Sequence, residues 1–184
     1  SIGLCAFTNC NALANVAISE TVTSIGETAF FNCNSLKNLT LSEGVTSIGR
    51  GAFENCNSLT NVTIPGSVTN MEGDAFNCCS KLESVTISEG VTNIGWGAFK
   101  NCSSLTNVTI PSSVKNISSY AFYECNNLKD IFYYGTSSDW SGISVKDNNT
   151  PLADATIHYS STSKDLGDVN GDGEVDNLDA AMIL

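Results

Sequence analysis

The sequence predicts a repeat solenoid, in which short parallel strands from successive coils stack into sheets. Several residue types recur every 23 residues without slippage, and each repeat contains a short segment that alternates apolar and polar side chains as a half-buried strand does. Columns of this kind are the signature of stacked structural units. The columns are Ala6, Ala29, Ala52, Ala75, Ala98 and Ala121; Phe7, Phe30, Phe53, Phe76, Phe99 and Phe122; Cys10, Cys33, Cys56, Cys79, Cys102 and Cys125; and Leu13, Leu36, Leu59, Leu82, Leu105 and Leu128.

The alternating segment predicts one short strand per coil, as at Asn61–Ile64. Pro65 and Pro111 follow two of these segments, and we expect the strand ladder to stop there. The segment Val45–Ile48 is typical of a second extended stretch.

Glycines and the Ala-Phe-x-x-Cys segment supply the remaining turns of each coil. Gly26, Gly49 and Gly95 fit turns, and the Ala-Phe-x-x-Cys segment fits one helical or 3₁₀ turn. One coil cannot bury its own apolar side chains, whereas coils stacked about 4.8 Å apart can. The first residues already carry the pattern, so we expect more repeats or a cap before Ser1.

The repeat unit V-T-x-I-G-x-x-A-F-x-N-C-x-x-L-x-x-V-T-I-[SP] resembles the BspA-like leucine-rich repeats of bacterial surface antigens. The resemblance covers residues 1–134 as six 23-residue repeats. It implies a leucine-rich-repeat right-handed superhelix with short parallel strands and 3₁₀ or helical turns. It also implies a secreted, cell-surface-associated protein whose repeats bind a protein or glycan.

Residues 135–159 look like the C-terminal cap that closes such arrays, with Trp140 inside it and a strand-like run at Ala155–Tyr159. All five tyrosines lie at or after Tyr120. Their amphipathic rings suit a cap that covers the open end of the core. A carbohydrate-stacking platform is the alternative interpretation.

The cysteine column predicts buried free thiols. Equivalent Cβ atoms in adjacent coils point in parallel, about 1 Å too far apart for a disulfide. One sulfur per coil in a line also does not suit tetrahedral zinc. Cys5 and Cys78 are the two cysteines with potential for redox chemistry, because Cys5 lies near the exposed edge and Cys78 replaces the asparagine of other repeats.

The sequence does not predict an enzyme. The single histidine, His158, lies in the cap, and we expect it to be a bystander rather than the base for a cysteine nucleophile. The polar rows Thr40, Thr63, Thr86 and Thr109, and Asn38, Asn61, Ser84 and Asn107, form either a binding surface, an ice-binding one included, or simply the solvent face of a sheet.

Charge excludes some partners. Nineteen acidic against eight basic residues give a net charge of −11, which disfavours binding to nucleic acid or anionic membranes. No apolar run is long enough to insert into a membrane. Six of the acids lie from Asp165 onward, without any base.

A calcium loop is predicted in the acidic tail, after a polar linker at residues 160–164. Oxygen donors occupy positions 1, 3, 5, 9 and 12 of a twelve-residue loop, and Glu174 at position 7 can offer its carbonyl. A merely solvated acidic tail is the alternative. The expected ligands are Asp168, Asn170, Asp172, Glu174, Asp176 and Asp179.

Residues 165–184, a partial EF-hand-like segment, resemble the first half of a type I dockerin, truncated within its helix. The aspartate at position 12, Asp179, is similar to the family pattern. The resemblance implies calcium as cofactor, a cohesin domain of a scaffold protein as partner, and Asn177 and Leu178 as contact residues.

Three functions follow as hypotheses. The first is a secreted non-catalytic recognition module of a cellulosome-type complex, attached by a calcium-dependent dockerin–cohesin interaction. The second is a cell-surface adhesin without a scaffold. The third is an accessory region of a polysaccharide-degrading enzyme whose catalytic domain lies outside this chain.

Overall fold

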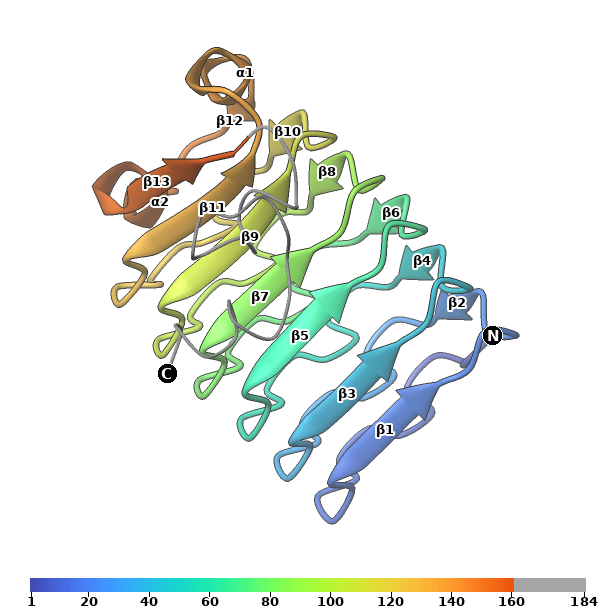
Figure 1. Cartoon of the computed structure of the whole chain (residues 1–184). Helices are drawn as coiled ribbons and strands as arrows, with labels where there is room; N and C mark the ends of the chain where they lie inside the picture. The colour runs from blue at the N-terminus through green and yellow to red at the C-terminus, as the bar shows by residue number, and fades with distance from the viewer. Residues whose placement is uncertain (161–184) are drawn as a thin grey trace, which may run out of the picture.

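A computed structural model describes residues 1–160 and shows the chain wound into six successive coils followed by a cap (Figure 1). The strands of successive coils lie side by side, so residues 23 apart are neighbours. The predicted calcium and cohesin sites lie outside the described residues. These are Asp168, Asn170, Asp172, Glu174, Asp176, Asn177, Leu178 and Asp179.

The longer strands form one face of the solenoid, which we call the main sheet. Parallel pairing joins β1 to β3, and β5, β7, β9, β11 and β13 into a second, five-stranded ladder. The predicted strand in each coil is therefore confirmed. The bounds are β1 Asn15–Ile18, β3 Asn38–Leu41, β5 Asn61–Ile64, β7 Ser84–Ile87, β9 Asn107–Pro111, β11 Asp130–Tyr134 and β13 Thr156–Tyr159.

Pro65 and Pro111 behave differently at the ends of their strands. The strand β5 ends before Pro65, as expected, but β9 includes Pro111, which pairs with Tyr134 of β11. A proline lacks only the N–H, so its residue can still lie in register beside a neighbouring strand.

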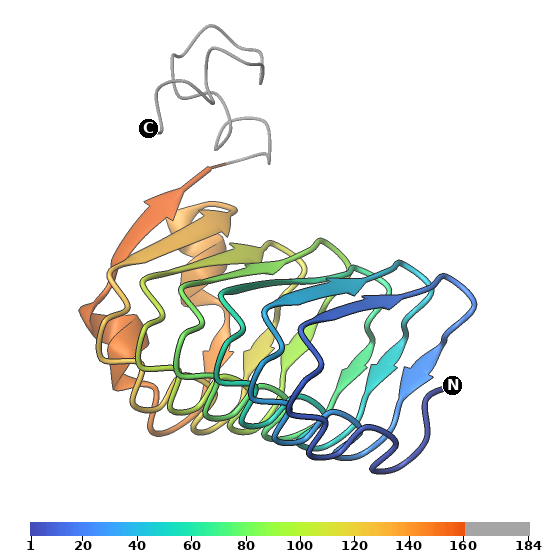
Figure 2. The same cartoon turned by 90° about the horizontal axis from the view of Figure 1, so that it is seen from below.

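The second extended stretch forms a line of two-residue strands on another side of each coil (Figure 2). In register, β2 pairs with β4 and β4 with β6, while β8, β10 and β12 form a second ladder. The bounds are β2 Ser24–Ile25, β4 Ser47–Ile48, β6 Asn70–Met71, β8 Asn93–Ile94, β10 Asn116–Ile117 and β12 Ser144–Val145.

The Ala-Phe-x-x-Cys segment forms 3₁₀-type turns, one of the two predicted forms, and not a continuous helical turn. Its amides alternate between two partners: Ala29 N–H donates to the Gly26 carbonyl three residues back, whereas Phe30 N–H donates to Ala52 in the next coil at 2.8 Å. Each 3₁₀-type turn therefore stops after one bond. We call this third side the turn run; it lies along the lower edge in Figure 2.

Two columns of left-handed residues cause the alternation in the turn run. In one column φ lies between 58° and 60° at Gly51, Asp74 and Gly97, and in the other it is 59° at Asn32 and Asn101. A left-handed residue interrupts helical propagation and turns its amide toward the adjacent coil. Asparagine tolerates this conformation, which explains its recurrence at Asn9, Asn32, Asn55 and Asn101.

Gly26, Gly49 and Gly95 each begin a turn, as expected, because each carbonyl accepts from the alanine N–H three residues later. Close contact with the adjacent coil is a further reason for their recurrence. A Cβ on Gly49 would lie 2.6 Å from the backbone nitrogen of Glu27, and one on Gly95 would lie 2.3 Å from the Met71 carbonyl oxygen. These glycines therefore allow adjacent coils to approach closely. Their φ values are not in the left-handed region.

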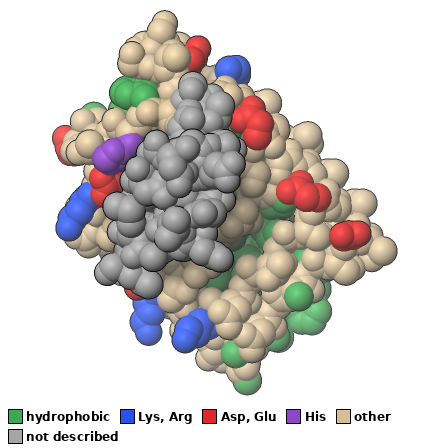
Figure 3. Space-filling view, in the orientation of Figure 1, with side chains coloured by type: hydrophobic (Ala, Val, Ile, Leu, Met, Phe, Trp, Pro, Cys, Tyr) green, Lys and Arg blue, Asp and Glu red, His purple; other side chains and the backbone are tan. Residues whose placement is uncertain are grey.

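The core is a set of columns that run along the solenoid. The rings of Phe30, Phe53, Phe76 and Phe99 stack with centroids 5.1–5.5 Å apart, and all four are buried. Phe7 in the first coil is 42% exposed, because among residues 1–160 only the second coil packs against it. Hydrophobic side chains accordingly gather at the end that carries β1 (Figure 3).

Residues 135–159 extend both ladders and cover the end of the core that follows the sixth coil. The short helices α1 Ser137–Ser141 and α2 Thr150–Asp154 flank β12, and β13 adds the last strand of the main sheet. Tyr133 is fully buried and packs edge-on against Trp140, with centroids 5.2 Å apart. Ser160 is also buried, and its N–H donates to the Tyr133 carbonyl.

Candidate binding surfaces

The outward face of the main sheet carries the two polar rows that the sequence indicates. Thr63 and Thr86 are exposed and in register, and Asn61, Ser84 and Asn107 form the neighbouring row. Inward positions of the same strands, such as Val62 and Ile64, are buried. The face is therefore polar because its backbone alternation places threonine outside and aliphatic side chains inside.

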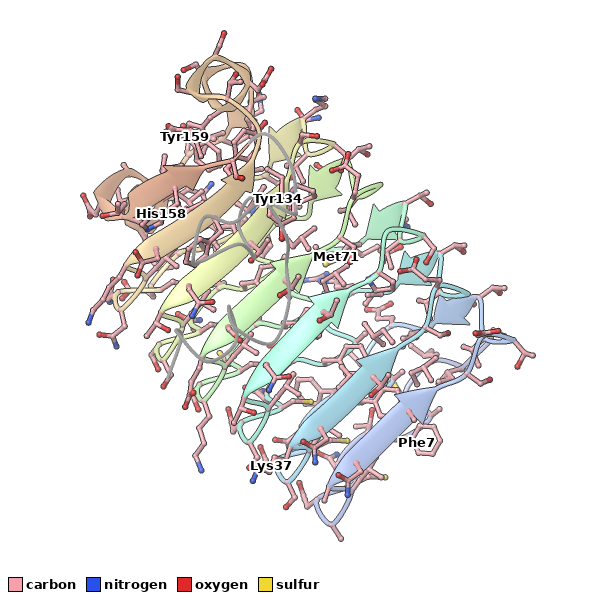
Figure 4. All side chains as sticks on the ribbon, viewed as in Figure 1. Phe7, Lys37, Met71, Tyr134, His158 and Tyr159 are labelled. Atoms are coloured by element: carbon pink, nitrogen blue, oxygen red, sulfur yellow. The ribbon has the colours of Figure 1, made fainter. Side chains whose placement is uncertain are left out.

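The polar rows end in an aromatic and acidic cluster at the cap. Phe132 follows Thr109 in register and His158 follows Phe132; the two rings stack with centroids 4.9 Å apart. His158 Nε2 lies 2.8 Å from Asp130 Oδ1, on the surface of the main sheet (Figure 4). Tyr134 shares this outward face of β11.

His158 hydrogen-bonds to a carboxylate, that of Asp130, and no hydrogen bond joins it to a thiol among residues 1–160. Its bystander role stays a prediction. Within residues 1–160 there is also no cluster of three or more histidine, cysteine, aspartate or glutamate residues arranged to hold a metal ion.

The cysteines of the described chain are free thiols, as predicted. Each buried thiol donates to the carbonyl of the phenylalanine 26 residues earlier, for example Cys79 Sγ to Phe53 at 3.3 Å and Cys102 Sγ to Phe76 at 3.3 Å. Burial raises the pKa of Cys56 and of Cys125 to about 12, and this opposes formation of the reactive thiolate.

Three cysteines differ from this pattern. Cys10 belongs to the column but is only half-buried, because the first coil is open on one side. Cys5 is exposed and Cys78 is half-buried, and both have left-handed backbone. They are the accessible thiols that the sequence indicates, but they lie in the first and fourth coils and do not form a pair.

A second surface, which the sequence analysis missed, lies at the corner between β8 and the turn run. The exposed ring of Trp96 and the half-buried rings of Tyr120 and Tyr123 meet there, and we call them the aromatic cluster. The Trp96 and Tyr120 centroids are 5.4 Å apart, and those of Tyr120 and Tyr123 are 5.3 Å apart. Lys100 Nζ lies 5.5–5.9 Å from all three centroids. Trp96 is 44% exposed.

Charged side chains lie on the coils beside the aromatic cluster. Asp74 is 7% exposed and its carboxylate is 3.8 Å from the Arg50 guanidinium. Burial raises the pKa of Asp74, whereas Arg50 and Lys100 lower it in part. Burial also raises the pKa of Glu54, and its repulsion from Asp74 adds to this effect.

The tyrosine interpretation is therefore only partly right. Tyr133 covers the end of the core, but Tyr159 is 44% exposed (Figure 4), and Tyr120 and Tyr123 lie on the sixth coil rather than in the cap. The sequence feature that could have indicated the aromatic cluster is a departure from the repeat. Trp96 stands at a position where other coils have Glu27, Arg50, Gly73 and Ser119.

The fold defines a parallel-strand repeat solenoid, and comparison with known proteins identifies its family. The model of the BspA type leucine-rich repeat region matches six copies over residues 1–129. The chain belongs to this BspA-type leucine-rich repeat family. No curated protein matches it.

Three solved structures resemble the chain. A leucine-rich repeat protein from T. pallidum has a TM-score of 0.68 and 34% identity, covering 71% of this chain and 61% of its own. A leucine-rich cell surface protein from Faecalibacterium prausnitzii has a TM-score of 0.55 and 34% identity, and the match covers 78% of this chain and 32% of that protein. A leucine-rich repeat protein from Eubacterium ventriosum has a TM-score of 0.62 and 26% identity, and the match covers 64% of this chain and 32% of that protein.

The chain thus spans less than two thirds of the length of these relatives. Among the helices of residues 1–160, none has the length and apolar character needed to cross a membrane.

Proposed function

We propose that the chain is a non-catalytic binding module displayed at a bacterial cell surface, with the main sheet as its contact face. The relative from Faecalibacterium prausnitzii is described as a cell surface protein, which supports this location. The family assignment supports a binding rather than a catalytic role.

The regular register of the main sheet and its buried core are the observations that carry the proposal. Five strands hold Thr63, Thr86 and Thr109 in register, and the core behind them is fully buried. A preordered surface loses little conformational entropy when a macromolecule binds to it. The row of rings and carboxylate at Asp130, Phe132 and His158 adds a non-repetitive end that can fix the position of a partner.

Surface variants test this proposal. Thr63→Arg with Thr86→Arg places two bulky charges on the main sheet, and Thr69→Arg with Thr92→Arg places the same charges at exposed positions on the short-strand side. Binding to plates coated with mucin, serum proteins or cellulose is measured for both variants and the parent chain. We expect the main-sheet variant alone to lose at least tenfold in binding. Equal binding by both variants, or no binding to any plate, would contradict the proposal.

The mode of attachment is a further part of the proposal and rests on the sequence of residues 168–179. We propose that this segment binds calcium and that the parent protein joins a scaffold through a cohesin domain, as a secreted recognition module of a cellulosome-type complex would. A surface adhesin that is not attached to a scaffold, and an accessory region of a polysaccharide-degrading enzyme, are the alternatives. A second D-x-N-x-D-G loop in the parent sequence would favour the scaffold, and a wall anchor or a hydrolase domain would favour one of the others.

A further inference from the structure

We propose that the aromatic cluster is a binding subsite for a neutral pyranose sugar of a glycan. It would stack the sugar on Trp96 with Tyr120 and Tyr123 beside it, and Lys100 would donate to a sugar oxygen. The inference rests on the proposed function, because it names a ligand class for a non-catalytic binding module. It concerns a different side of the solenoid from the main sheet.

The cluster is not a product of the repeat. Each of its rings replaces a smaller or more polar residue at most equivalent positions. The column of Tyr123, for example, contains Thr8, Glu54, Asn77 and Lys100 as well as Phe31. The rings contribute little to the core, since Trp96 is 44% exposed and both tyrosines are half-exposed. Core packing therefore does not explain why three large rings gather on two adjacent coils.

The backbone at Tyr120 is strained. Its φ is +62°, in the column where the two preceding coils have Asp74 and Gly97. A bulky aromatic residue rarely adopts this conformation, which the turn run requires at this position of every coil. In this conformation Tyr120 lies between Trp96 and Tyr123 and contacts both rings.

The ring geometry favours a sugar over a flat apolar partner. The interplanar angles are 50° between Trp96 and Tyr120 and 62° between Tyr120 and Tyr123. The three rings are therefore splayed and do not form one flat platform. Each can offer a face of the size of one pyranose ring, whose C–H groups form an apolar face inside a rim of hydroxyls. Tyrosine and tryptophan supply this combination of apolar face and polar edge.

The local charges favour a neutral ligand. Lys100 and Arg50 are balanced by Glu54 and Asp74, which lie on neighbouring coils and interact with them electrostatically. The two carboxylates disfavour an anion. A quaternary ammonium ligand would meet the Lys100 ammonium, which already lies near all three rings. Uncharged hydroxyls can instead accept from the Lys100 ammonium.

Tryptophan fluorescence provides a direct test, because the chain has two tryptophans. The Trp140→Phe variant of the full chain leaves Trp96 as the single indole and keeps an aromatic ring beside Tyr133. The variant is titrated to 20 mM with gluco-, manno-, xylo-, galacto- and N-acetylglucosamine oligosaccharides, with oligogalacturonate, and with tetramethylammonium chloride. We expect saturable quenching or a spectral shift with at least one neutral oligosaccharide.

Three further variants show which residues bind the sugar. Binding is measured by fluorescence where Trp96 is present and by calorimetry for Trp96→Ala. Trp96→Ala should abolish it. Tyr120→Asn should weaken it at least tenfold while retaining the fold, since asparagine tolerates the left-handed backbone. Lys100→Met, which keeps most of the stem but removes the ammonium, should weaken it several-fold. Tyr159→Ala, at an exposed ring in β13, is the control and should bind as the parent does.

The inference is overturned if no neutral oligosaccharide binds, if only oligogalacturonate or tetramethylammonium binds, or if binding survives Trp96→Ala. Its failure is distinguishable from failure of the proposed function. Binding to a coated plate that is lost with the Thr63 and Thr86 variant but kept by Trp96→Ala would support the main sheet and refute the subsite.

Discussion

At the residue scale, the side chain of Asn149 accepts the hydrogen bond that an alanine carbonyl of the next coil accepts elsewhere. In the other coils the phenylalanine N–H donates to an alanine carbonyl of the next coil, as Phe99 does to Ala121. Phe122 instead donates to Asn149 Oδ1 at 3.0 Å, and Asn149 Nδ2 donates to the Ser118 and Lys146 carbonyls. One buried side-chain amide therefore provides partners for the Phe122 N–H and for the Ser118 and Lys146 carbonyls at the end of the turn run.

Replacing this amide should destabilise the cap. Asn149→Leu keeps a similar volume but leaves the buried Phe122 N–H without a partner, which should cost about 1–3 kcal/mol. Reversible urea unfolding measures the change. Lys146→Ala, at an exposed side chain nearby, is the control, and an equal loss in both variants would contradict the role given to Asn149.

A second prediction at this scale concerns the phenylalanine column. Phe76 is fully buried between Phe53 and Phe99. Phe76→Ala should therefore lower the free energy of unfolding by roughly 3–5 kcal/mol, through lost burial and the cavity that remains. Thr86→Ala on the solvent face should change it by less than about 0.5 kcal/mol. A loss below about 1 kcal/mol for Phe76→Ala would show that the column is not essential to the core.

At the element scale, the turn run shows what the sequence could and could not predict. The strand columns have period-two alternation, so both strand sets were predictable, and only their ends at Pro111 differed. The Ala-Phe-x-x-Cys spacing resembles a helical turn, because three to four residues separate its apolar members. The distinguishing signal was the recurrence of asparagine at Asn32 and Asn101, which reflects left-handed backbone rather than apolar periodicity.

The thiol column should make the stability depend on alkaline pH. The ordinary thiol pKa is 9.0, and the folded chain raises that of Cys56 and Cys125 to about 12 by burial. Below pH 9 the thiols are protonated in both the folded and unfolded states. Between pH 9 and pH 12 the unfolded chain ionises first, so the free energy of unfolding should fall as pH rises.

Unfolding at pH 8 and pH 10.5 measures this effect, and the double variant Cys56→Ala and Cys125→Ala should show a smaller fall than the parent. Thiol titration gives an independent check. Cys33, Cys56, Cys79, Cys102 and Cys125 should react only in denaturant. Rapid reaction of all eight cysteines in the native chain would refute the buried column.

At the scale of the whole molecule, what repeats was predictable and what departs from the repeat was not. Six coils and a column of buried thiols follow from the recurring residues of one sequence, whereas the closing segment was expected from a family resemblance. The rings of the aromatic cluster differ from most residues of their columns, and Asn149 lies in the cap, outside the repeats. The Trp96–Tyr120 contact and the Asn149 hydrogen bonds to Phe122 and Ser118 join residues 24 to 31 apart. Residues that recur every 23 positions do not reveal these contacts, because the contacts depend on residues that occur once.

The acidic segment should bind calcium without changing the solenoid. Carboxylates of Asp168, Asp172, Asp176 and Asp179 repel one another unless a cation neutralises them. Calorimetric titration at low salt should reveal one site that Asp168→Ala abolishes, while the unfolding midpoint of the repeats remains unchanged. Asp154→Ala in the cap is the control. Binding that survives Asp168→Ala would refute the assigned ligands.

The stacking of the coils also fixes the distance between any two coils as a multiple of one strand spacing. Each coil advances the array by one strand spacing, about 4.8 Å, and each coil bonds only to its neighbours. Insertion of one 23-residue unit between the second and third coils would therefore leave the aromatic cluster and Asn149 in their present surroundings. It would move them one strand spacing away from β1, so the distance between the first coil and the proposed sugar subsite can change in fixed steps while the subsite itself stays the same.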